Sequence, residues 1–177
     1  MSSADTEKYA PQVATHRRTT SAILSTTKKL IARSGVAKIS MIEISDESEV
    51  SRATLYNHYR DKESVLRALA ESEFARLIAV AEKGNTPQEI LQLLSQEISG
   101  NSALATMRAT DPALLTQALT HQSDELWATF LHSFSQLIPD HVLAATSLRW
   151  LIGQVFAPLT PEQSTIQSEA LTHRAHL

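Results

Sequence analysis

Cysteine, glycine and aromatic residues are scarce in this sequence. Its 177 residues contain no cysteine, four glycines and 5% aromatic residues. The absence of cysteine excludes disulfides, thiolate metal ligands and a cysteine nucleophile, and it fits a reducing, cytoplasmic compartment. No stretch approaches the roughly eighteen uncharged apolar residues of a membrane span, and the first residues lack the apolar core of a secretory signal. We therefore expect a globular cytoplasmic protein.

Signals for strands and for catalysis are missing as well. No segment alternates apolar and polar residues over a useful length, and no Asn-Gly or Asp-Gly hairpin turn occurs. Neither a G-x-S-x-G elbow nor an H-E-x-x-H metal motif is present. We expect no enzyme activity, no catalytic or metal-binding residues and no cofactor.

The net charge of −3 is unevenly distributed along the chain. Residues 1–62 hold ten Lys and Arg against seven Asp and Glu, whereas residues 63–177 hold six against twelve. A basic first third favours an anionic partner for that part. A solvated face of mixed charge would explain so modest an excess equally well, so charge alone does not decide the function.

The remaining pattern is that of a chain of helices. Apolar residues recur at spacings of three and four, and glycines and prolines separate the periodic runs. Residues 1–16 are polar and aperiodic and include Pro11, so we expect a disordered arm there. The sequence predicts an all-α protein with helices near 17–33, 41–48, 51–58, 62–82, 87–99, 101–109, 112–136, 140–157 and 161–174.

Two short predicted helices near residues 40–59 form a helix-turn-helix. Ser40 and Glu43 make a capping box that opens the first helix, and Ser51 caps the second. We expect Ile42, Ile44 and Val50 to pack on helix 17–33, while Leu55 and Tyr59 point inward from the second helix. A helix of two turns is too short to be stable alone, so its polar face is either plain surface or a contact face.

The polar face of the second helix suits the major groove of DNA. Small Ala53 allows close approach to the bases, while Arg52 matches guanine and Asn57 matches adenine. Thr54, Tyr56, His58 and Lys62 suit phosphates, and Lys62 lies beside a helix start that also favours an anion. The predicted DNA-binding residues are Ser51, Arg52, Ala53, Thr54, Tyr56, Asn57, His58 and Lys62.

The run from Val50 to Glu63 (VSRATLYNHYRDKE) resembles the recognition-helix signature of the TetR family of bacterial transcription regulators. That pattern reads roughly G-V-S-x-x-T-L-Y-x-H-F-x-x-K-E, and the run from Ile23 to Gly35 resembles the family's first helix and its closing glycine. The resemblance covers about residues 17–70. It implies a homodimer on a palindromic operator, with base contacts from the second helix and a helical domain that binds a small molecule.

Two features depart from the family pattern. Glu49 stands where the turn glycine is expected, so the backbone must turn without the permissive residue. The first helix of the motif carries Glu43, Asp46 and Glu47. If these carboxylates face the DNA backbone, each weakens phosphate contact; if they face solvent or the basic first helix, they are neutral or mildly stabilising.

The second half of the chain offers weaker signals for an effector and a dimer. Large apolar side chains there are ordinary core residues or, following the resemblance, line a pocket with a few polar groups. The candidate effector residues are Met107, Arg108, Trp127, Phe130, His132 and Trp150. The dimer surface is expected at about residues 140–174, where Gly153 either allows close approach of a partner backbone or adjoins an internal side chain such as Trp150.

These observations predict a DNA-binding head joined through a linking helix to a helical regulatory body. We expect the arm at 1–16, the head at 17–77 and the regulatory and dimerisation domain at 78–177. The predicted function is a ligand-responsive regulator, a repressor by family resemblance, with double-stranded DNA, a second copy of the chain and a small apolar or aromatic effector as partners. The alternatives are a dimeric DNA-binding protein without an effector and a helical adaptor that has lost DNA binding.

Overall fold

The computed structural model describes residues 3–120 and 125–173, with side chains from residue 14 onward. These residues form helices connected by short turns and contain no strand, which confirms the all-α prediction. None of the described helices is long and apolar enough to cross a membrane. The helices are α1 (Ser3–Ser34), α2 (Met41–Glu47), α3 (Arg52–His58), α4 (Lys62–Ala81), α5 (Pro87–Ser99), α6 (Ser102–Thr110), α7 (Pro112–Thr120), α8 (Glu125–Leu137), α9 (His141–Phe156) and α10 (Pro161–His173).

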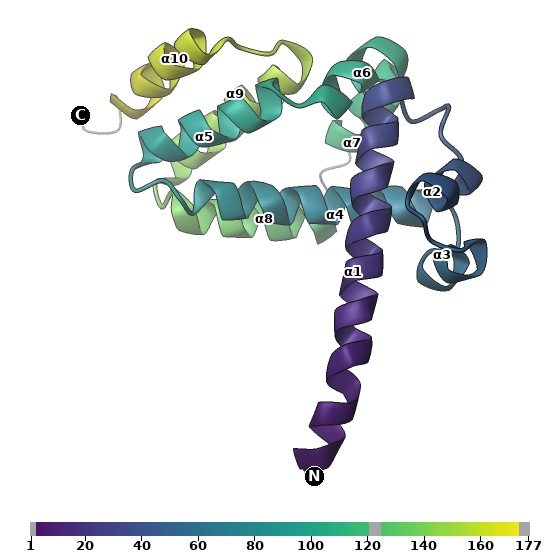
Figure 1. Cartoon of the computed structure of the whole chain (residues 1–177). Helices are drawn as coiled ribbons and strands as arrows, with labels where there is room; N and C mark the ends of the chain where they lie inside the picture. Colours follow the sequence, from purple (N-terminus) through teal and green to yellow (C-terminus); the bar gives the residue numbers. More distant parts are fainter. Residues whose placement is uncertain (1–2, 121–124, 174–177) are drawn as a thin grey trace.

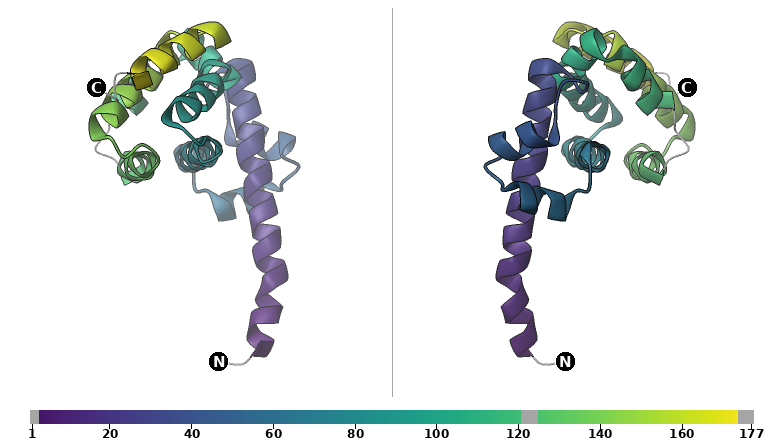
Figure 2. Two further views of the ribbon diagram at one scale, coloured as in Figure 1. Left: turned by 90° about the vertical axis from the view of Figure 1, so that its left-hand side faces the viewer. Right: turned by 90° about the vertical axis from the view of Figure 1, so that its right-hand side faces the viewer.

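Helices α1–α3 and the first half of α4 make a head, and α5–α10 with the second half of α4 make a body (Figure 1). Helix α1 extends far beyond the rest of the molecule at its N-terminal end (Figure 1). Figure 2 shows α4 and α8 nearly along their axes, lying side by side. Helices α4 and α8 therefore run next to each other along one side of the body, and the first half of α4 belongs to the head.

Helix α1 begins earlier than the sequence predicted. It starts at Ser3, so most of the expected disordered arm over residues 1–16 is helical in the structure. Extending a helix that is already packed adds one hydrogen bond per residue, whereas starting a new helix fixes several residues for one bond. The aperiodic polar pattern of this segment therefore did not reveal the helix.

The single helix expected at 112–136 is also two helices in the structure, α7 and α8. The indole Nε1 of Trp127 donates to the carbonyl oxygen of Ala118 at 3.1 Å. Residues nine apart in a continuous helix are separated by roughly 13 Å along the axis, so Ala118 and Trp127 do not belong to one continuous helix. Apolar periodicity continues through both segments, which is why the sequence pattern did not reveal the break.

Polar side chains fix where the head helices begin. Ser40 Oγ accepts from the N–H of Glu43 at 3.2 Å, and the Glu43 carboxylate accepts from the N–H of Ser40 at 2.9 Å, which confirms the predicted capping box. Ser51 Oγ accepts from the N–H of Thr54 at 3.1 Å and so caps α3. Asp61 caps α4 in the same way. Each cap satisfies backbone donors that a short helix leaves unpaired.

The head and the body have separate hydrophobic cores that meet at α6. The head core consists of Ile23, Leu24, Leu30, Ile31, Val36, Ile39, Ile44, Leu55, Val65, Leu69 and Ala103. The body core consists of Ala81, Ile90, Leu91, Leu94, Ile98, Leu115, Phe134, Ile138, Leu143, Ala144, Leu151 and Val155. Helix α4 contributes to both cores, and Met107 of α6 packs against both.

Polar contacts across the junction hold the body to the end of α1. Thr106 of α6 donates its hydroxyl to the carbonyl oxygen of Ala32 at 2.6 Å. The carboxylate of Asp111 accepts from the backbone N–H groups of Val36 and Ala37 at 2.9 and 3.1 Å. We call this set, from Thr106 to Asp111 against Ala32 to Ala37, the α6 joint. It ties the loop that precedes α2 to the body.

Candidate DNA-binding interface

The turn between α2 and α3 is held by hydrogen bonds from buried Ser45. Its hydroxyl donates to the carbonyl oxygen of Val50 at 2.7 Å, and the N–H of Val50 donates to the carbonyl oxygen of Ser45 at 3.2 Å. Ser48 donates its hydroxyl to the carbonyl oxygen of Ile44 at 2.6 Å and so covers the end of α2. These bonds fix the direction in which α3 leaves α2.

Glu49 adopts the left-handed backbone conformation that the turn requires. Its φ is +57°, the only positive φ of a non-glycine residue in the described part of the chain. This conformation brings Cβ close to the following carbonyl and costs roughly 1–2 kcal/mol for a residue other than glycine. The prediction that the turn lacks its permissive residue is confirmed, and the head stores strain at this position.

Helix α3 presents one face to solvent and one to the head core. Leu55 is completely buried, which anchors the helix, as predicted. Arg52, Ala53, Tyr56 and Asn57 are exposed. Because a helix places residues i, i+1, i+4 and i+5 on one broad side, these four side chains form a single exposed face, which we call the reading face.

The other predicted DNA-binding residues lie around this reading face in more constrained settings. Ser51 and Thr54 share a hydroxyl–hydroxyl hydrogen bond of 2.8 Å, so both hydroxyls already have a partner at the helix start. Thr54 and His58 are half-buried. Side chains held in this way add few contacts of their own, but they fix where the reading face points.

Lys62 has internal partners that the sequence did not indicate. Its ammonium donates to the carbonyl oxygens of Val36 and Ile39, both at 3.2 Å. An ammonium has three donors, so one remains for a phosphate. Lys62 therefore braces the loop between α1 and α2 beside the α6 joint, and its role on DNA stays a prediction.

The acidic residues of α2 are partly neutralised within the head. Glu43 belongs to the capping box, and Glu47 Oε1 lies 2.6 Å from Arg33 Nη2 on α1. The Glu47 hydrogen bond and charge raise the pKa of Arg33. Glu47 therefore faces the basic first helix, which is one of the two orientations expected for the carboxylates of α2. Asp46 and Glu49 are exposed.

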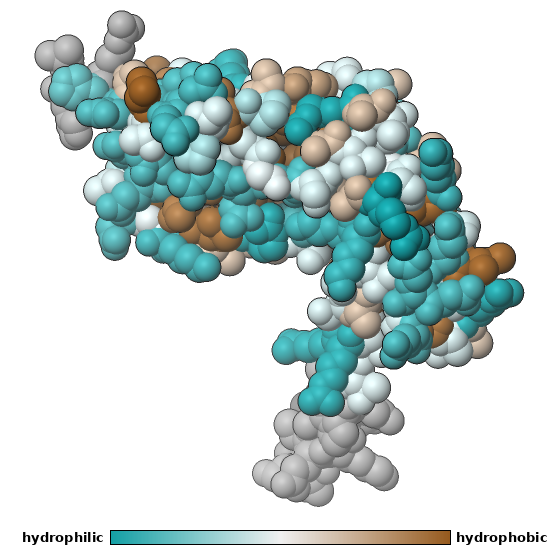
Figure 3. Space-filling model, turned by 45° about the horizontal axis from the view of Figure 1, so that its top comes forward, coloured by the Kyte–Doolittle hydropathy of each residue, from teal (hydrophilic) through white to brown (hydrophobic). Residues whose placement is uncertain are grey.

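Ile42 does not pack on α1 as the sequence predicted. Its neighbour Ile44 is completely buried, whereas Ile42 is 50% exposed. Residues two apart on a helix point to different sides, so α2 buries only one of them against α1. On the face shown in Figure 3, a hydrophobic patch lies at the outer edge of the head among hydrophilic side chains.

His58, the last residue of α3, lies against α1. Its ring stacks on that of His16 with centroids 4.3 Å apart, and its Nδ1 is 3.3 Å from the hydroxyl oxygen of Thr20. Burial, followed by the charge of His16, lowers the pKa of His58. This contact brings the N-terminal half of α1 beside the reading face. The sequence analysis assigned His16 to a disordered arm and so missed it.

The sequence pattern of the bacterial regulatory proteins of the tetR family matches residues 23–69. This segment runs from the buried part of α1 through α2 and α3 into the head half of α4. Residues 23–69 therefore form a TetR-type DNA-binding head. Proteins with this head are bacterial transcription regulators, in agreement with the predicted helix-turn-helix.

An uncharacterised helix-turn-helix transcriptional regulator of Haemophilus influenzae is 33% identical to this chain over 61 residues. That alignment spans 34% of this chain and 33% of the relative. The fatty acid degradation regulator FadR of Bacillus halodurans has a similar structure, with a TM-score of 0.64 and 13% identity over 88% of this chain and 93% of that one. FadR of Bacillus subtilis in complex with stearoyl-CoA gives a TM-score of 0.55 and 16% identity, with 86% and 95% covered. At these identities the two structures show a shared fold.

The predicted effector residues of the body do not meet at one place. Trp127 and Phe130 are buried together around Phe74, whose ring centroid lies 5.0 and 4.8 Å from theirs. His132 is exposed on α8. Trp150 donates its indole N–H to the side chain of Gln167 at 2.7 Å.

The two candidates on α6 are used in packing between elements. Met107 fills the junction between the cores. The guanidinium of Arg108 donates to the carbonyl oxygen of Val155 at 2.9 Å, which ties α6 to α9. Of the predicted set, only Trp127 and Phe130 therefore lie together, while the other four occupy separate positions.

An open groove runs between α4 and α8 beside this aromatic pair. Its volume is about 590 Å³. Phe74 and Ile78 of α4 and Leu126 and Phe130 of α8 line its apolar floor, and charged and hydroxyl side chains line its rim. A groove with apolar walls and a polar rim suits an elongated apolar molecule. We call it the α4–α8 groove.

Proposed function

We propose that this TetR protein is a ligand-responsive repressor that binds a palindromic operator as a homodimer in the cytoplasm. The observation that carries the proposal is the reading face of α3, which is exposed, rich in donors and fixed from behind by buried Leu55. A rigid short helix with exposed Arg52 and Asn57 fits the major groove. The domain limits we propose are the head at 17–77 and the body at 78–177, because α4 carries residues of both cores.

The test of DNA reading uses duplexes selected from a random-sequence library by the wild-type protein. Arg52→Ala should relax the preference at one base position, at a loss of roughly 1–3 kcal/mol. Tyr56→Phe should weaken binding alike on selected and scrambled duplexes, because phosphates carry no sequence information. If Arg52→Ala left the selected motif unchanged, α3 would not read bases as proposed.

Lys62→Ala separates two roles for this side chain. A phosphate contact predicts a decrease of about one in the salt dependence of log Kd against log salt concentration. Its bonds to Val36 and Ile39 instead predict a lower melting temperature of the free protein. We expect both effects, since the ammonium has one donor left. An unchanged salt dependence would restrict Lys62 to bracing the loop.

The proposed dimer surface is formed by α9 and α10, within residues 140–174. Exposed apolar side chains on these helices support it: Val142 is 62%, Phe156 47% and Ile166 66% exposed. A Cβ at Gly153 would meet no atom within 4 Å, so no internal neighbour requires glycine there. A close partner backbone is the remaining reason for a residue that costs a helix interior about 1 kcal/mol.

Gly153→Leu tests this dimer surface. The substitution should shift the protein toward monomer in sedimentation at micromolar concentration, while the fold of the monomer persists. Exposed Ala128 on α8 supplies the control, because Ala128→Leu adds similar bulk outside the proposed surface. A Gly153→Leu protein that remained dimeric with an unchanged melting temperature would place the interface elsewhere.

The α4–α8 groove is the proposed effector site. Helix α4 carries Val65 and Leu69 in the head core and Phe74 and Ile78 in the groove, so a molecule between α4 and α8 acts directly on the helix that positions the head. FadR from Bacillus subtilis has a similar fold, and its structure was solved in complex with stearoyl-CoA. This similarity favours an elongated apolar effector for the α4–α8 groove. A ligand releases DNA only if it binds the DNA-free arrangement more tightly.

Octanoate, palmitate and stearoyl-CoA are suitable probes of this site. A compound that binds should raise the melting temperature by mass action and should release DNA. At a concentration of a hundred times its Kd, it should add about 2.7 kcal/mol to the free energy of unfolding. Phe74→Ala should remove the response, whereas Leu114→Ala, on an exposed position of α7, should retain it. If none of these ligands changed melting or DNA binding, a dimeric DNA-binding protein without an apolar effector would be favoured.

The adaptor alternative receives less support from the head. It rested on the acidic α2 and on Glu49 at the turn. Glu43 and Glu47 are occupied by Ser40 and Arg33, and Glu49 completes the turn despite its strain. These carboxylates have structural partners or positions, so they do not by themselves argue against DNA binding.

A further inference from the structure

We propose that Arg17 on α1 is a second DNA anchor that binds a backbone phosphate beside the C-terminal end of α3. The inference rests on the proposed function, because it takes α3 as the reading helix. It assigns to α1 a binding role in addition to its packing role in the head.

The position of α1 relative to α3 is fixed by two contacts. His16 stacks on His58, and Thr20, one turn further along, bonds to the same ring. By contrast, α2 meets α1 near its other end, through the ion pair of Glu47 with Arg33. The reading face therefore lies beside the N-terminal half of α1, and α1 continues for roughly 20 Å beyond His16. Figure 1 shows this part of α1 extending past α3.

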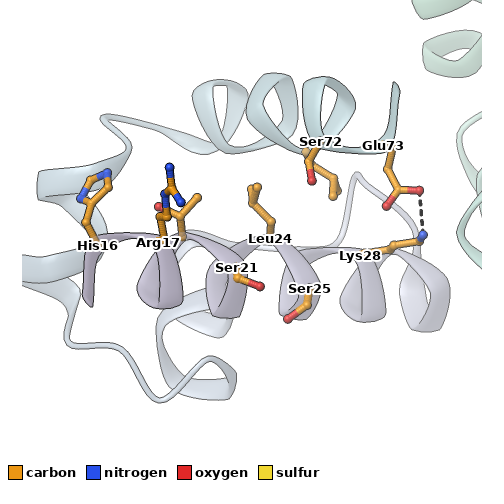
Figure 4. Close-up of a pocket in the computed structure, with 10 residues that line it drawn as sticks. His16, Arg17, Ser21, Leu24, Ser25, Lys28, Ser72 and Glu73 are labelled. Carbon is orange, nitrogen blue, oxygen red and sulfur yellow. Dashed lines mark hydrogen bonds and ion pairs between the residues drawn. The ribbon is translucent and has the colours of Figure 1, made fainter. Parts of the chain in front are cut away.

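Arg17 borders a groove between α1 and α4 of about 460 Å³. In Figure 4 its side chain rises from α1 next to His16, at the end of the groove opposite Lys28 and Glu73. The hydroxyl-bearing residues Thr20 and Ser72 also line the groove. Such a surface offers hydrogen-bond donors around a guanidinium, which suits the oxygens of a phosphate.

The cations of α1 differ in whether a carboxylate neutralises them. Lys28 is 2.7 Å from Glu73, and Arg33 is 2.6 Å from Glu47. Arg17 is exposed and makes no ion pair with the residues whose side chains the structure describes. A guanidinium that makes no such ion pair, one residue from the His16 that stacks on α3, is available to a DNA phosphate at no cost of an internal ion pair.

Arg18 provides an internal control within the same turn. Successive helix residues are about 100° apart, so Arg18 lies about 200° around α1 from His16, on the side away from α3. It is exposed like Arg17 and carries the same charge. A contact that depends on geometry distinguishes the two arginines, whereas a general attraction of the basic segment to DNA does not.

The experiment measures Kd by fluorescence anisotropy between 50 and 300 mM KCl, on the full chain and a duplex selected by the wild-type protein. Arg17→Gln should reduce the slope of log Kd against log salt by about 0.9, the value for one phosphate contact, and weaken binding several-fold. Arg18→Gln and Lys29→Gln, both at exposed positions of α1, should change the slope much less. Circular dichroism and melting of each variant check that α1 still folds.

Hydroxyl-radical footprinting adds a positional readout. Wild-type protection should include sugars next to the segment covered by α3, and Arg17→Gln should lose protection there while keeping it elsewhere. An unchanged slope and footprint for Arg17→Gln, or an equal loss for Arg18→Gln, would overturn the proposal. Arg52→Ala in the same series tests the proposed reading by α3 separately from the α1 anchor. If Arg52→Ala lost sequence preference while Arg17→Gln had no effect, only the α1 anchor would be refuted.

Discussion

The head and the body of this protein are packed in different ways. The head core is aliphatic and closed: Ile23, Ile44, Leu55 and Val65 are completely buried, and polar caps complete the starts of α2, α3 and α4. The body core is also mainly aliphatic, but a row of aromatic rings adjoins it. Phe130 lies between Trp127 and Phe134 at centroid distances of 6.0 and 6.1 Å and faces the α4–α8 groove.

This difference indicates where each region tolerates change. A closed core with fixed caps moves as a unit, which suits a surface that must match the spacing of bases. The aromatic row borders the open groove through Phe130, so a ligand in the groove adds contacts without displacing core residues. We therefore propose that the head reads DNA and that the body responds to an effector at the α4–α8 groove.

The two regions are connected by polar contacts as well as by α4. Glu73 of α4 bonds both Lys28 of α1, at 2.7 Å, and Arg76, at 3.1 Å. Arg76 in turn reaches Glu97 of α5 at 2.5 Å. With the α6 joint, these bonds link the head to the body beside the apolar contacts of α4 and Met107. Polar bonds can be exchanged for others as helices shift, which apolar interdigitation resists.

The largest expected effects come from removing one core at a time. Phe134→Ala should cost about 3–5 kcal/mol and Leu55→Ala about 2–5 kcal/mol of unfolding free energy, by lost burial and by the cavity left behind. Both tryptophans, Trp127 and Trp150, lie in the body, so fluorescence reports the body while circular dichroism reports the whole chain.

In urea unfolding, Phe134→Ala should move the fluorescence transition to lower urea concentration than the dichroism transition. Leu55→Ala should instead produce an early loss of helix with the fluorescence transition nearly in place. Coincident transitions in both variants would mean that head and body unfold as one cooperative unit, and the comparison would then describe packing but not stability.

A smaller effect is expected from the α6 joint. Hydrogen bonds from Thr110 and from the N–H groups of Val36 and Ala37 lower the pKa of Asp111. A carboxyl whose folded pKa is depressed contributes stability above its unfolded pKa of about 3.9, and this is lost as the pH falls through the folded value. Asp111→Ala should thus lower stability at pH 7 by about 1 kcal/mol, with the difference vanishing in acid.

Thermal unfolding of wild type and Asp111→Ala at pH 7 and at decreasing pH measures this contribution. Asp46→Ala is the matched control, since Asp46 is an exposed carboxyl of the head. If the difference between wild type and Asp111→Ala were independent of pH, the ionised carboxylate would not be what holds the loop. The link between head and body would then rest on α4 and the ion pairs.

Glu49→Gly should stabilise the head by about 1 kcal/mol, because glycine adopts the left-handed conformation without the Cβ clash. The melting temperature of the free protein measures this. Glu49→Ala removes the same carboxylate but retains Cβ, so it should give no such increase. A rise of equal size in both variants would mean that loss of the charge, and not relief of backbone strain at Glu49, stabilises the head.

Local signals were sufficient to predict much of the head. The capping box of Ser40 with Glu43, the cap at Ser51 and the inward position of Leu55 all depend on residues within one helical turn. The turn strain at Glu49 followed from the missing glycine. Such features are determined by neighbours in the sequence, and the structure confirms them.

Contacts between distant segments were outside what the sequence could predict. Lys62 finds the carbonyl oxygens of Val36 and Ile39, and His16 finds His58, only because helices far apart in the sequence cross there. The break between α7 and α8 likewise depends on how the segments pack, since apolar spacing continues on both sides. The effector candidates scattered because chemical character alone does not determine which side chains meet.

The smallest expected effect concerns the histidine stack that joins α3 to α1. Burial, then the charge of His16, lowers the pKa of His58, so the folded head binds fewer protons here than the unfolded chain does. Stability should therefore fall as the pH drops from the unfolded value of about 6.5 through the folded one, by less than about 1 kcal/mol. The informative quantity is the stability of wild type minus that of His58→Gln between pH 8 and 5.5, because groups present in both proteins cancel. That difference should decrease with falling pH. Phosphates favour the protonated ring, so DNA should oppose the trend and bind wild type more tightly at the acidic end. If the stability difference for His58→Gln did not change with pH, the folded head would not lower the pKa of His58. The contact between α3 and α1 would then not belong to the closed packing of the head. The contrast with the body would lie at α1 rather than between the two cores.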